Sequence, residues 1–316
     1  MDYSEIKLHI LFDFKDTPWG GGNQFLKLLR KYFIAHNLYE DNAEDADAVI
    51  FDSHHNLKDV LRCRRNHSRQ LMPDWKVFIH RLGPVFTLAR NTPKLDKLIF
   101  RYNNQIADGT IFQSNWSRDT FRELGFKPKN AETVIMNACD PTIFYPRLID
   151  INDKRIKLIT TSWSPNFEGK GFNILQYLDR TLDFEKYSFL FLGNSPVKFE
   201  NIVALPPQPA QVVSMLLASS DIFIAPSIND ACSNSLIEAL ACGCPAVARN
   251  SGGNPEIVKK GGVMFEGKDD ILEAINSLGT NVDKARTNIS VPLISEVGAA
   301  YFNFAMAVYN GDVSGF

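Results

Sequence analysis

Short apolar runs of strand length alternate with longer amphipathic stretches along nearly the whole chain of 316 residues. This alternation is typical of βαβ units, in which crossover helices join parallel strands, and it predicts an α/β fold. The pattern predicts strands over 8–12, 48–51, 77–82, 109–112, 133–136, 156–161, 188–192, 222–225, 246–248 and 263–265. It predicts helices over 23–36, 116–124, 172–182, 211–218, 235–241, 269–278 and 294–309.

A polar, proline-punctuated segment interrupts this alternation once. It runs from Asn137 through Pro141 and Pro146 to a charged stretch over 150–155, behind which the pattern restarts. Because a chain of this length holds about two domains, we expect a first domain over 1–150 and a second over 151–316. Two such domains bind ligands in a cleft between the carboxyl ends of their strands.

Charge and composition exclude several classes of protein. The net charge of −2 argues against a nucleic-acid protein with a strongly basic surface. The N-terminus has no basic region of a signal peptide, and the longest weakly polar stretch, 236–248, carries Glu238 and Pro245, so we expect a cytoplasmic protein. Five sparse cysteines do not form a disulfide framework, and Cys242-Gly243-Cys244 is a weak metal signal, so no metal is expected.

Two carboxylates follow the predicted strand 222–225. Asp230 falls in a polar loop, and Glu238, with seven residues between them, lies near the start of the next predicted helix. Carboxylates at this place accept hydrogen bonds from the hydroxyls of a sugar or ribose, and the helix start contacts anions. Two plainer interpretations stay open: a capping box between Ser235 and Glu238, and an Asx turn at Asp230.

The stretch around these carboxylates resembles the signature of glycosyltransferase family 4. The resemblance rests on Asp230, Glu238, Ala239-Leu240-Ala241-Cys242-Gly243-Cys244-Pro245 and Gly252-Gly253-Asn254-Pro255-Glu256. It implies the GT-B fold, two Rossmann-like domains with parallel sheets facing each other across a cleft. The last helix, about 292–310, is then expected to pack back toward the first domain.

The resemblance implies roles for residues of the second domain. Glu238 would bind the ribose of a nucleotide sugar, and Asp230, where the family usually has Glu, would contact the donor sugar. Ser233, Asn234 and Ser235 at the helix start would also bind the donor.

Lys170 belongs to Glu168-Gly169-Lys170-Gly171-Phe172, between a strand and a helix, where an ammonium lies beside helix N-terminal amides. By itself such a segment is more commonly the site of a solvated lysine. The resemblance implies that Lys170 neutralises the diphosphate. An Arg that often precedes the family's lysine is absent, and Ser162 is the candidate substitute.

In the first domain the resemblance implies a glycine-rich donor loop in Pro18-Trp19-Gly20-Gly21-Gly22-Asn23, with Gly21 and Gly22 as donor-binding residues. The plainer interpretation is a flexible turn. At the end of the strand 77–82 the resemblance implies that His80 contacts the donor sugar. Arg81, the next residue, is a weaker candidate for the same role. A histidine at a strand end is more often structural. Residues 113–118 and 134–146 resemble further elements that we interpret as hinge and cleft scaffolding.

A basic cluster lies outside the resemblance. It consists of Lys58, Arg62, Arg64, Arg65 and Arg69. Many family members contact anionic membranes through a basic face of the first domain, so this cluster is a candidate for peripheral membrane contact. A solvated basic face is an equally good interpretation, because Asp59 interrupts the cluster.

The function implied by the resemblance is transfer of a hexosyl group from a UDP- or GDP-sugar to an acceptor hydroxyl with retention at the anomeric carbon. The acceptor would be a glycan or lipid-linked sugar, as in polysaccharide or glycoconjugate biosynthesis, and the front-face mechanism needs no metal or cofactor. His80, Asp230 and Lys170 are the expected catalytic residues. Two alternatives stay open: a UDP-N-acetylhexosamine epimerase of the same fold, and a non-catalytic nucleotide-sugar-binding subunit.

Overall fold

The computed structural model describes residues 6–16, 21–69, 76–149, 152–164 and 168–315, with the backbone alone at 67–69. These residues form two compact units. Unit 1 comprises the chain up to Asp16, Gly22–Asn137 and the stretch from Leu293 onward, and unit 2 comprises Gly21 and Ala138–Pro292. Each unit contains one parallel sheet, as the alternation of apolar and amphipathic segments predicts.

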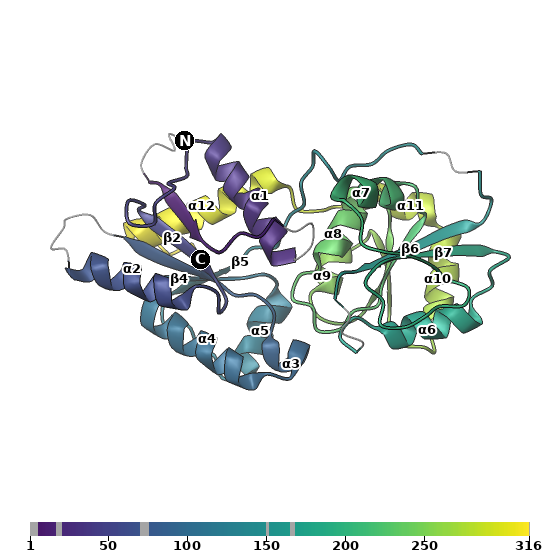
Figure 1. Cartoon of the computed structure of the whole chain (residues 1–316), viewed down its shortest axis with the longest axis horizontal. Coiled ribbons are helices and arrows are strands. Elements are labelled where there is room, and N and C mark those ends of the chain that lie inside the picture. The colour runs from purple at the N-terminus through teal and green to yellow at the C-terminus, as the bar shows by residue number, and fades with distance from the viewer. Residues whose placement is uncertain (1–5, 17–20, 70–75, 150–151, 165–167, 316) are drawn as a thin grey trace. The chain divides into compact units, whose positions relative to one another are not determined.

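The sheet of unit 1 has its strands in chain order, β1-β2-β3-β4-β5. Its strands are β1 (Leu8–Leu11), β2 (Ala48–Asp52), β3 (Val77–Arg81), β4 (Gly109–Phe112) and β5 (Ala131–Val134) (Figure 1). β2, β3 and β4 are buried along their whole length, because side chains cover both faces of a central parallel strand.

Helices surround this sheet. They are α1 (Gly21–Ala35), α2 (Leu57–Arg69), α3 (Phe86–Arg90), α4 (Pro93–Ile106), α5 (Asn115–Glu123) and α12 (Ile294–Asn310). α12, the last helix of the chain, packs against β2 and β3 and therefore belongs to unit 1 (Figure 1). Its buried residues Val297, Tyr301, Phe304 and Val308 share one face at helical spacing. The predicted return of the last helix to the first domain is confirmed.

The sheet of unit 2 has the order β11-β10-β9-β6-β7-β8. Its strands are β6 (Ile156–Ser162), β7 (Tyr187–Gly193), β8 (Val203–Leu205), β9 (Ile222–Ala225), β10 (Ala246–Arg249) and β11 (Gly262–Phe265). Counted from its first strand, this is the 3-2-1-4-5-6 order of a Rossmann fold, which reverses direction between β6 and β9. The short, exposed edge strand β8 was not predicted from the sequence, because three residues carry too little pattern.

The helices of unit 2 are α6 (Phe172–Thr181), α7 (Ala210–Ala218), α8 (Asn234–Ala241), α9 (Asn254–Val258), α10 (Ile271–Gly279) and α11 (Val282–Thr287). A core around Phe172, Phe191, Ile224 and Ile275 fills the space between the sheet and its helices. The apolar pattern along the chain predicts most of these elements to within a few residues.

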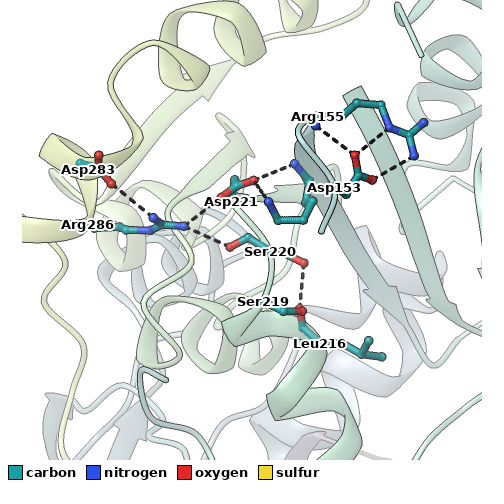
Figure 2. A network of polar contacts seen from close by, with 9 residues as sticks. Asp153, Arg155, Leu216, Ser219, Ser220, Asp221, Asp283 and Arg286 are labelled. Carbon is teal, nitrogen blue, oxygen red and sulfur yellow. Dashed lines mark hydrogen bonds and ion pairs between the residues drawn. The ribbon is translucent and has the colours of Figure 1, made fainter. Parts of the chain in front are cut away.

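A polar network fastens the amino ends of β6 and β9 to α11, as Figure 2 shows. Asp221 accepts hydrogen bonds from the backbone nitrogen and Nζ of Lys157, both at 2.8 Å, and from Arg286 Nη2 at 3.2 Å. Arg286 also pairs with Asp283 at 3.3 Å. Since a ligand site of a parallel sheet lies at the carboxyl ends of the strands, this network stabilises the opposite edge.

The segment 138–149 belongs to unit 2, whereas the sequence analysis assigned it to the first domain. Arg147 Nη1 donates to Ser214 Oγ on α7 at 2.6 Å, and Ser214 Oγ donates to the carbonyl of Ile143 at 2.5 Å. The Arg147 guanidinium also lies 3.7 Å from the centre of the Tyr145 ring. These contacts place the boundary between Asn137 and Ala138, and the predicted boundary residues 150 and 151 lie outside the described residues.

Candidate functional site

The point where the strand order of unit 2 reverses brings together two loops that are far apart in the sequence. One follows β6 and contains Lys170, and the other follows β9 and contains Asp230. Lys170 Nζ donates to Asp230 Oδ2 at 3.1 Å, with side-chain exposures of 33% and 24%. The structure therefore places two of the predicted catalytic residues side by side at the expected edge of the sheet.

Close backbone contact holds these loops against each other. The backbone nitrogen of Ile228 donates to the carbonyl of Gly169 at 3.1 Å. Gly171 caps α6 with φ of 67°, and a Cβ there would lie 2.2 Å from the carbonyl oxygen of Pro226. Because only glycine fits this left-handed position without strain or clash, Gly171 allows Lys170 to approach the β9 loop.

Asp230 also shapes its own loop. Its Oδ1 accepts a hydrogen bond from the backbone nitrogen of Cys232 at 3.3 Å. The Asx turn considered from the sequence is thus present, and the second carboxylate oxygen, Oδ2, is the one that pairs with Lys170. The Asp230 side chain therefore forms the Asx turn and pairs with Lys170 at the same time.

Glu238 lies on α8, which begins directly after this loop. The helix has Ser233 as its N-cap, without a side-chain capping hydrogen bond, so the capping box considered between Ser235 and Glu238 does not form. In the described part of the chain no hydrogen-bond donor reaches the Glu238 carboxylate, and burial raises its pKa to about 8. A partly buried carboxyl group without a donor costs folding free energy and accommodates a ligand that brings hydroxyl donors.

Thiols lie near this carboxyl group. Burial, and to a lesser degree the charges of Glu238 and Cys242, raise the pKa of the Cys139 thiol to about 12. Burial likewise raises the pKa of Cys242 to about 11. Both thiols are therefore neutral at physiological pH, and they act as small apolar groups rather than nucleophiles.

The other residues predicted for the second domain have mixed outcomes. Ser233 Oγ and Ser235 Oγ lie 3.2 Å apart at the start of α8, and Asn234 is the first residue of that helix. Ser162 is buried at the end of β6, where its hydroxyl donates to the carbonyl of Ser164 at 3.0 Å. Its hydrogen is thus engaged locally, which weakens Ser162 as a substitute for the missing arginine.

Gly21 and Gly22 are the first two residues of α1, whereas the sequence analysis placed them in a loop that precedes the helix. Among the described residues, nothing lies within 4 Å of the position that a Cβ on Gly22 would take. Pro18, Trp19 and Gly20 lie outside the described residues.

The structure places His80 in the core of unit 1 rather than at a ligand surface. The side chain is fully buried, and its Nε2 lies 2.8 Å from the Ser53 carbonyl and its Nδ1 3.2 Å from Asn103 Nδ2. Its ring stacks on Phe51 at 4.2 Å, and burial lowers its pKa to about 4. Both ring nitrogens are satisfied inside the unit, so we remove His80 from the catalytic set.

Arg81, the lesser candidate, is also a structural residue. It is buried, pairs with Asp52, and donates to Asn137 Oδ1 at 2.7 Å and to Tyr301 Oη at 3.1 Å. These bonds connect β3 to β2 and α12. Because a buried charge is stable only with such partners, Arg81 holds the core of unit 1 together.

The basic cluster maps to α2, but its members differ. Arg64 forms two hydrogen bonds with Asp108, at 2.6 and 2.9 Å, and lies 5.1 Å from the Phe78 ring, so it is a structural residue. Arg62 pairs with Asp59 at 2.9 Å. The exposed members Lys58, Arg62 and Arg65 border a hollow of about 330 Å³, and the side chain of Arg69 lies outside the described residues.

Among the described residues, no group of three or more His, Cys, Asp and Glu side chains is arranged to hold a metal ion. Within the same residues, none of the helices combines the length and the apolar character needed to cross a bilayer.

Comparison with known proteins agrees with this geometry. Residues 178–281 match the family described as glycosyl transferases group 1. Unit 2 contains a glycosyl transferases group 1 domain. The match spans β7 to α10 and therefore includes Asp230 and Glu238. It identifies the chain as a glycosyltransferase and confirms the family resemblance.

Solved structures are similar in fold over nearly the whole chain. Anabaena Alr3699/HepE in complex with UDP-glucose has a TM-score of 0.67 at 14% identity, with 97% of this chain and 98% of that chain covered. AviGT4, a glycosyltransferase involved in avilamycin A biosynthesis, has a TM-score of 0.61 at 12% identity, with 97% and 98% covered. These similarities confirm the two-domain GT-B fold.

A third similar structure, a mutant of S. aureus TarM in complex with Fondaparinux, alpha-GlcNAc-glycerol and UDP, has a TM-score of 0.60 at 16% identity. The similarity covers 89% of this chain and 58% of that chain. No curated protein sequence matches the chain.

One residue of this site was missed by the sequence analysis. Asn254 was quoted only as part of Gly252-Gly253-Asn254-Pro255-Glu256, yet its side chain is buried between the loops that follow β9 and β10. An asparagine beside two glycines looks like an ordinary turn residue. Only the positions of its tertiary partners distinguish it from one.

Proposed function

We propose that this glycosyltransferase moves a hexosyl group from a UDP- or GDP-sugar to an acceptor hydroxyl, with retention at the anomeric carbon and without a metal or cofactor. The observation that carries the proposal is the pairing of Lys170 with Asp230 at the strand-order reversal of unit 2, with Glu238 on the helix that follows the Asp230 loop. Such a reversal is where open α/β sheets bind nucleotides. Complexes of similar folds with UDP-glucose or UDP support a uridine nucleotide.

Glu238 is proposed to bind the ribose. The two vicinal hydroxyls of a ribose donate two hydrogen bonds, and the Glu238 carboxyl group has two acceptor oxygens without a donor among the described residues. Ribose binding would therefore offset the cost of burying this group. Amides in the first turn of α8 would contribute further donors to the nucleotide.

Lys170 and Asp230 are proposed to act on the reacting end of the donor. The bond between the anomeric carbon and the diphosphate breaks, and the Lys170 ammonium stabilises the charge that develops on the leaving oxygen. Asp230 accepts hydrogen bonds from the donor sugar and holds it in place for attack. The acceptor oxygen bonds to the anomeric carbon from the face that the diphosphate leaves, and its proton passes to the departing phosphate.

The acceptor is proposed to be a glycan or a lipid-linked sugar. Exposed Lys58, Arg62 and Arg65 on α2 supply cations for an anionic acceptor or membrane surface, whereas Arg64 is engaged by Asp108. Co-sedimentation with anionic and neutral vesicles tests this contact. Equal sedimentation with both vesicle types would contradict it.

The nucleotide site is tested by thermal unfolding in the presence of UDP-glucose, UDP-galactose, UDP-N-acetylglucosamine, GDP-mannose or UDP, followed by assay of nucleotide release. A bound donor stabilises the folded chain by mass action, so at least one donor should raise Tm. Glu238→Ala should abolish that shift and the turnover. Glu273→Ala, which removes an exposed helical glutamate of α10, is the matched control and should change neither.

Each proposed element can fail separately in this assay. An undiminished rate in Glu238→Ala contradicts the ribose role. Epimerisation of UDP-N-acetylglucosamine without any acceptor contradicts transfer as the reaction. Binding without nucleotide release over a panel of acceptors contradicts catalysis.

A further inference from the structure

Asp230 lies on a loop whose position depends on a third loop, the one that follows β10. The backbone nitrogen of Gly253 donates to the Asp230 carbonyl at 2.8 Å. The backbone nitrogen of Asn229 donates to Ser251 Oγ at 3.0 Å. Gly252 has φ of 64°, and a Cβ there would lie 2.3 Å from the Asp230 carbonyl oxygen, so the two loops are in direct backbone contact.

The Asn254 side chain holds this arrangement together from inside. It is 1% exposed, and its Nδ2 donates to the Ser227 carbonyl at 3.3 Å and to the Arg249 carbonyl at 3.1 Å. Both partners are acceptors, which places the amide nitrogen, and not the oxygen, between them. One buried side chain thus joins the end of β10 to Ser227, which precedes Asp230 by three residues in the same loop.

The remaining atom of this amide shows that Asn254 is not optimised for stability. Its Oδ1 is buried without a hydrogen-bond partner among the described residues. An unpaired buried acceptor lowers stability, and an apolar residue of similar size would avoid that cost. What an apolar residue cannot supply is the N–H group that fixes Ser227.

We infer that Asn254 is a positioning residue for catalysis, which acts through Asp230 by fixing the loop over 227–230. This inference rests on the proposed function, because it requires Asp230 to contact the donor sugar. Glu238, the proposed ribose ligand, lies on α8 outside these hydrogen bonds, so its contact with the nucleotide does not depend on Asn254. Loss of Asn254 therefore lowers kcat far more than it weakens nucleotide binding.

The test is a double-mutant cycle on donor turnover, with UDP binding measured by calorimetry. Asn254→Ala should lower kcat at least tenfold, while the KM for the donor and the Kd for UDP change less than twofold. Asn254→Ser, which retains one hydrogen-bond donor, should recover part of kcat and serves as the second variant if Asn254→Ala does not fold. In an Asp230→Asn background, Asn254→Ala should have less than a twofold further effect, since both changes remove the same contribution.

Asp179→Ala is the matched structural control. Asp179 is also buried in unit 2 and also fixes a loop, because it accepts hydrogen bonds from the backbone nitrogens of Glu200, Asn201 and Ile202 at 2.8 to 2.9 Å. That loop precedes the edge strand β8 and lies outside the three loops of the site. The control should lower Tm without changing kcat.

The outcomes separate the inference from the proposed function. If Asp230→Asn turns over donor at the wild-type rate, the proposed role of Asp230 fails first. If Asp230→Asn is impaired and the two changes combine multiplicatively, Asn254 does not act through Asp230 and the inference alone fails. An equal loss of kcat in Asp179→Ala and Asn254→Ala would show that loosening any loop of unit 2 has the same effect. That result also overturns the inference.

Discussion

Glu238→Gln should stabilise the folded chain at neutral pH even though it removes a proposed ligand-binding group. Burial raises the pKa of Glu238 from its usual value near 4.5 to about 8 in the folded state. The folded state therefore holds a proton that the unfolded chain releases. Stability from this group is present in full below pH about 4.5 and falls as pH rises toward 8.

The magnitude follows from the pKa difference. Each pH unit between the two pKa values lowers the free energy of unfolding by about 1.4 kcal/mol, so the loss at pH 7 is about 3 kcal/mol. Glutamine has nearly the same shape and does not titrate, so the variant avoids this loss. In a chain of this size the gain corresponds to a rise in Tm of about 4–5 °C at pH 7.

The assay is thermal unfolding of wild type and variant between pH 4 and pH 8. The difference in Tm should be near zero at the acidic end and should grow steadily with pH. Glu273→Gln, in which an exposed glutamate of α10 is neutralised, should show no such trend. A difference in Tm that is constant across pH would refute the argument that Glu238 is destabilised by burial of its charge.

The same variant should lose UDP binding while it gains stability, because the ribose hydroxyls bind the ionised form of Glu238, whose two oxygens both accept, whereas a glutamine amide presents one acceptor oxygen. Residues at functional sites are often suboptimal for stability, and this pair of opposite effects is the expected signature. A more stable variant with unchanged UDP affinity would contradict the ribose assignment but not the pKa argument.

Two further predictions concern other parts of the chain. His80→Ala should lower the free energy of unfolding by about 2–4 kcal/mol, because it leaves a cavity beside Phe51 and an unpaired Ser53 carbonyl. The kcat of the folded fraction should not change. A loss of kcat without a loss of stability would show that His80 acts in catalysis. Gly171→Ala should lower Tm and donor turnover together. The new Cβ clashes with the Pro226 carbonyl, and the left-handed backbone at residue 171 costs an alanine about 1–2 kcal/mol by itself. Unchanged turnover would show that this close approach does not position Lys170.

The sequence predicted the site of unit 2 better than that of unit 1, for a physical reason. Asp230 and Glu238 belong to one continuous strand-loop-helix unit, so their spacing along the chain already determines their approximate placement. His80 lies on a central parallel strand that is buried on both faces, where the alternation of side chains does not distinguish a ligand-facing residue from a core residue. The resemblance assigned it a role that its surroundings in this chain do not support.

Sequence by itself thus determined the α/β class, the approximate strands and helices, and the two carboxylates that follow β9, because each depends on local pattern and short spacing. Tertiary structure decided the rest. It paired Lys170 with Asp230, left the Glu238 carboxylate without a donor among the described residues, and buried Asn254 between two loops. These features arise from strand order and close packing between segments far apart in the chain, which no local pattern of residues encodes.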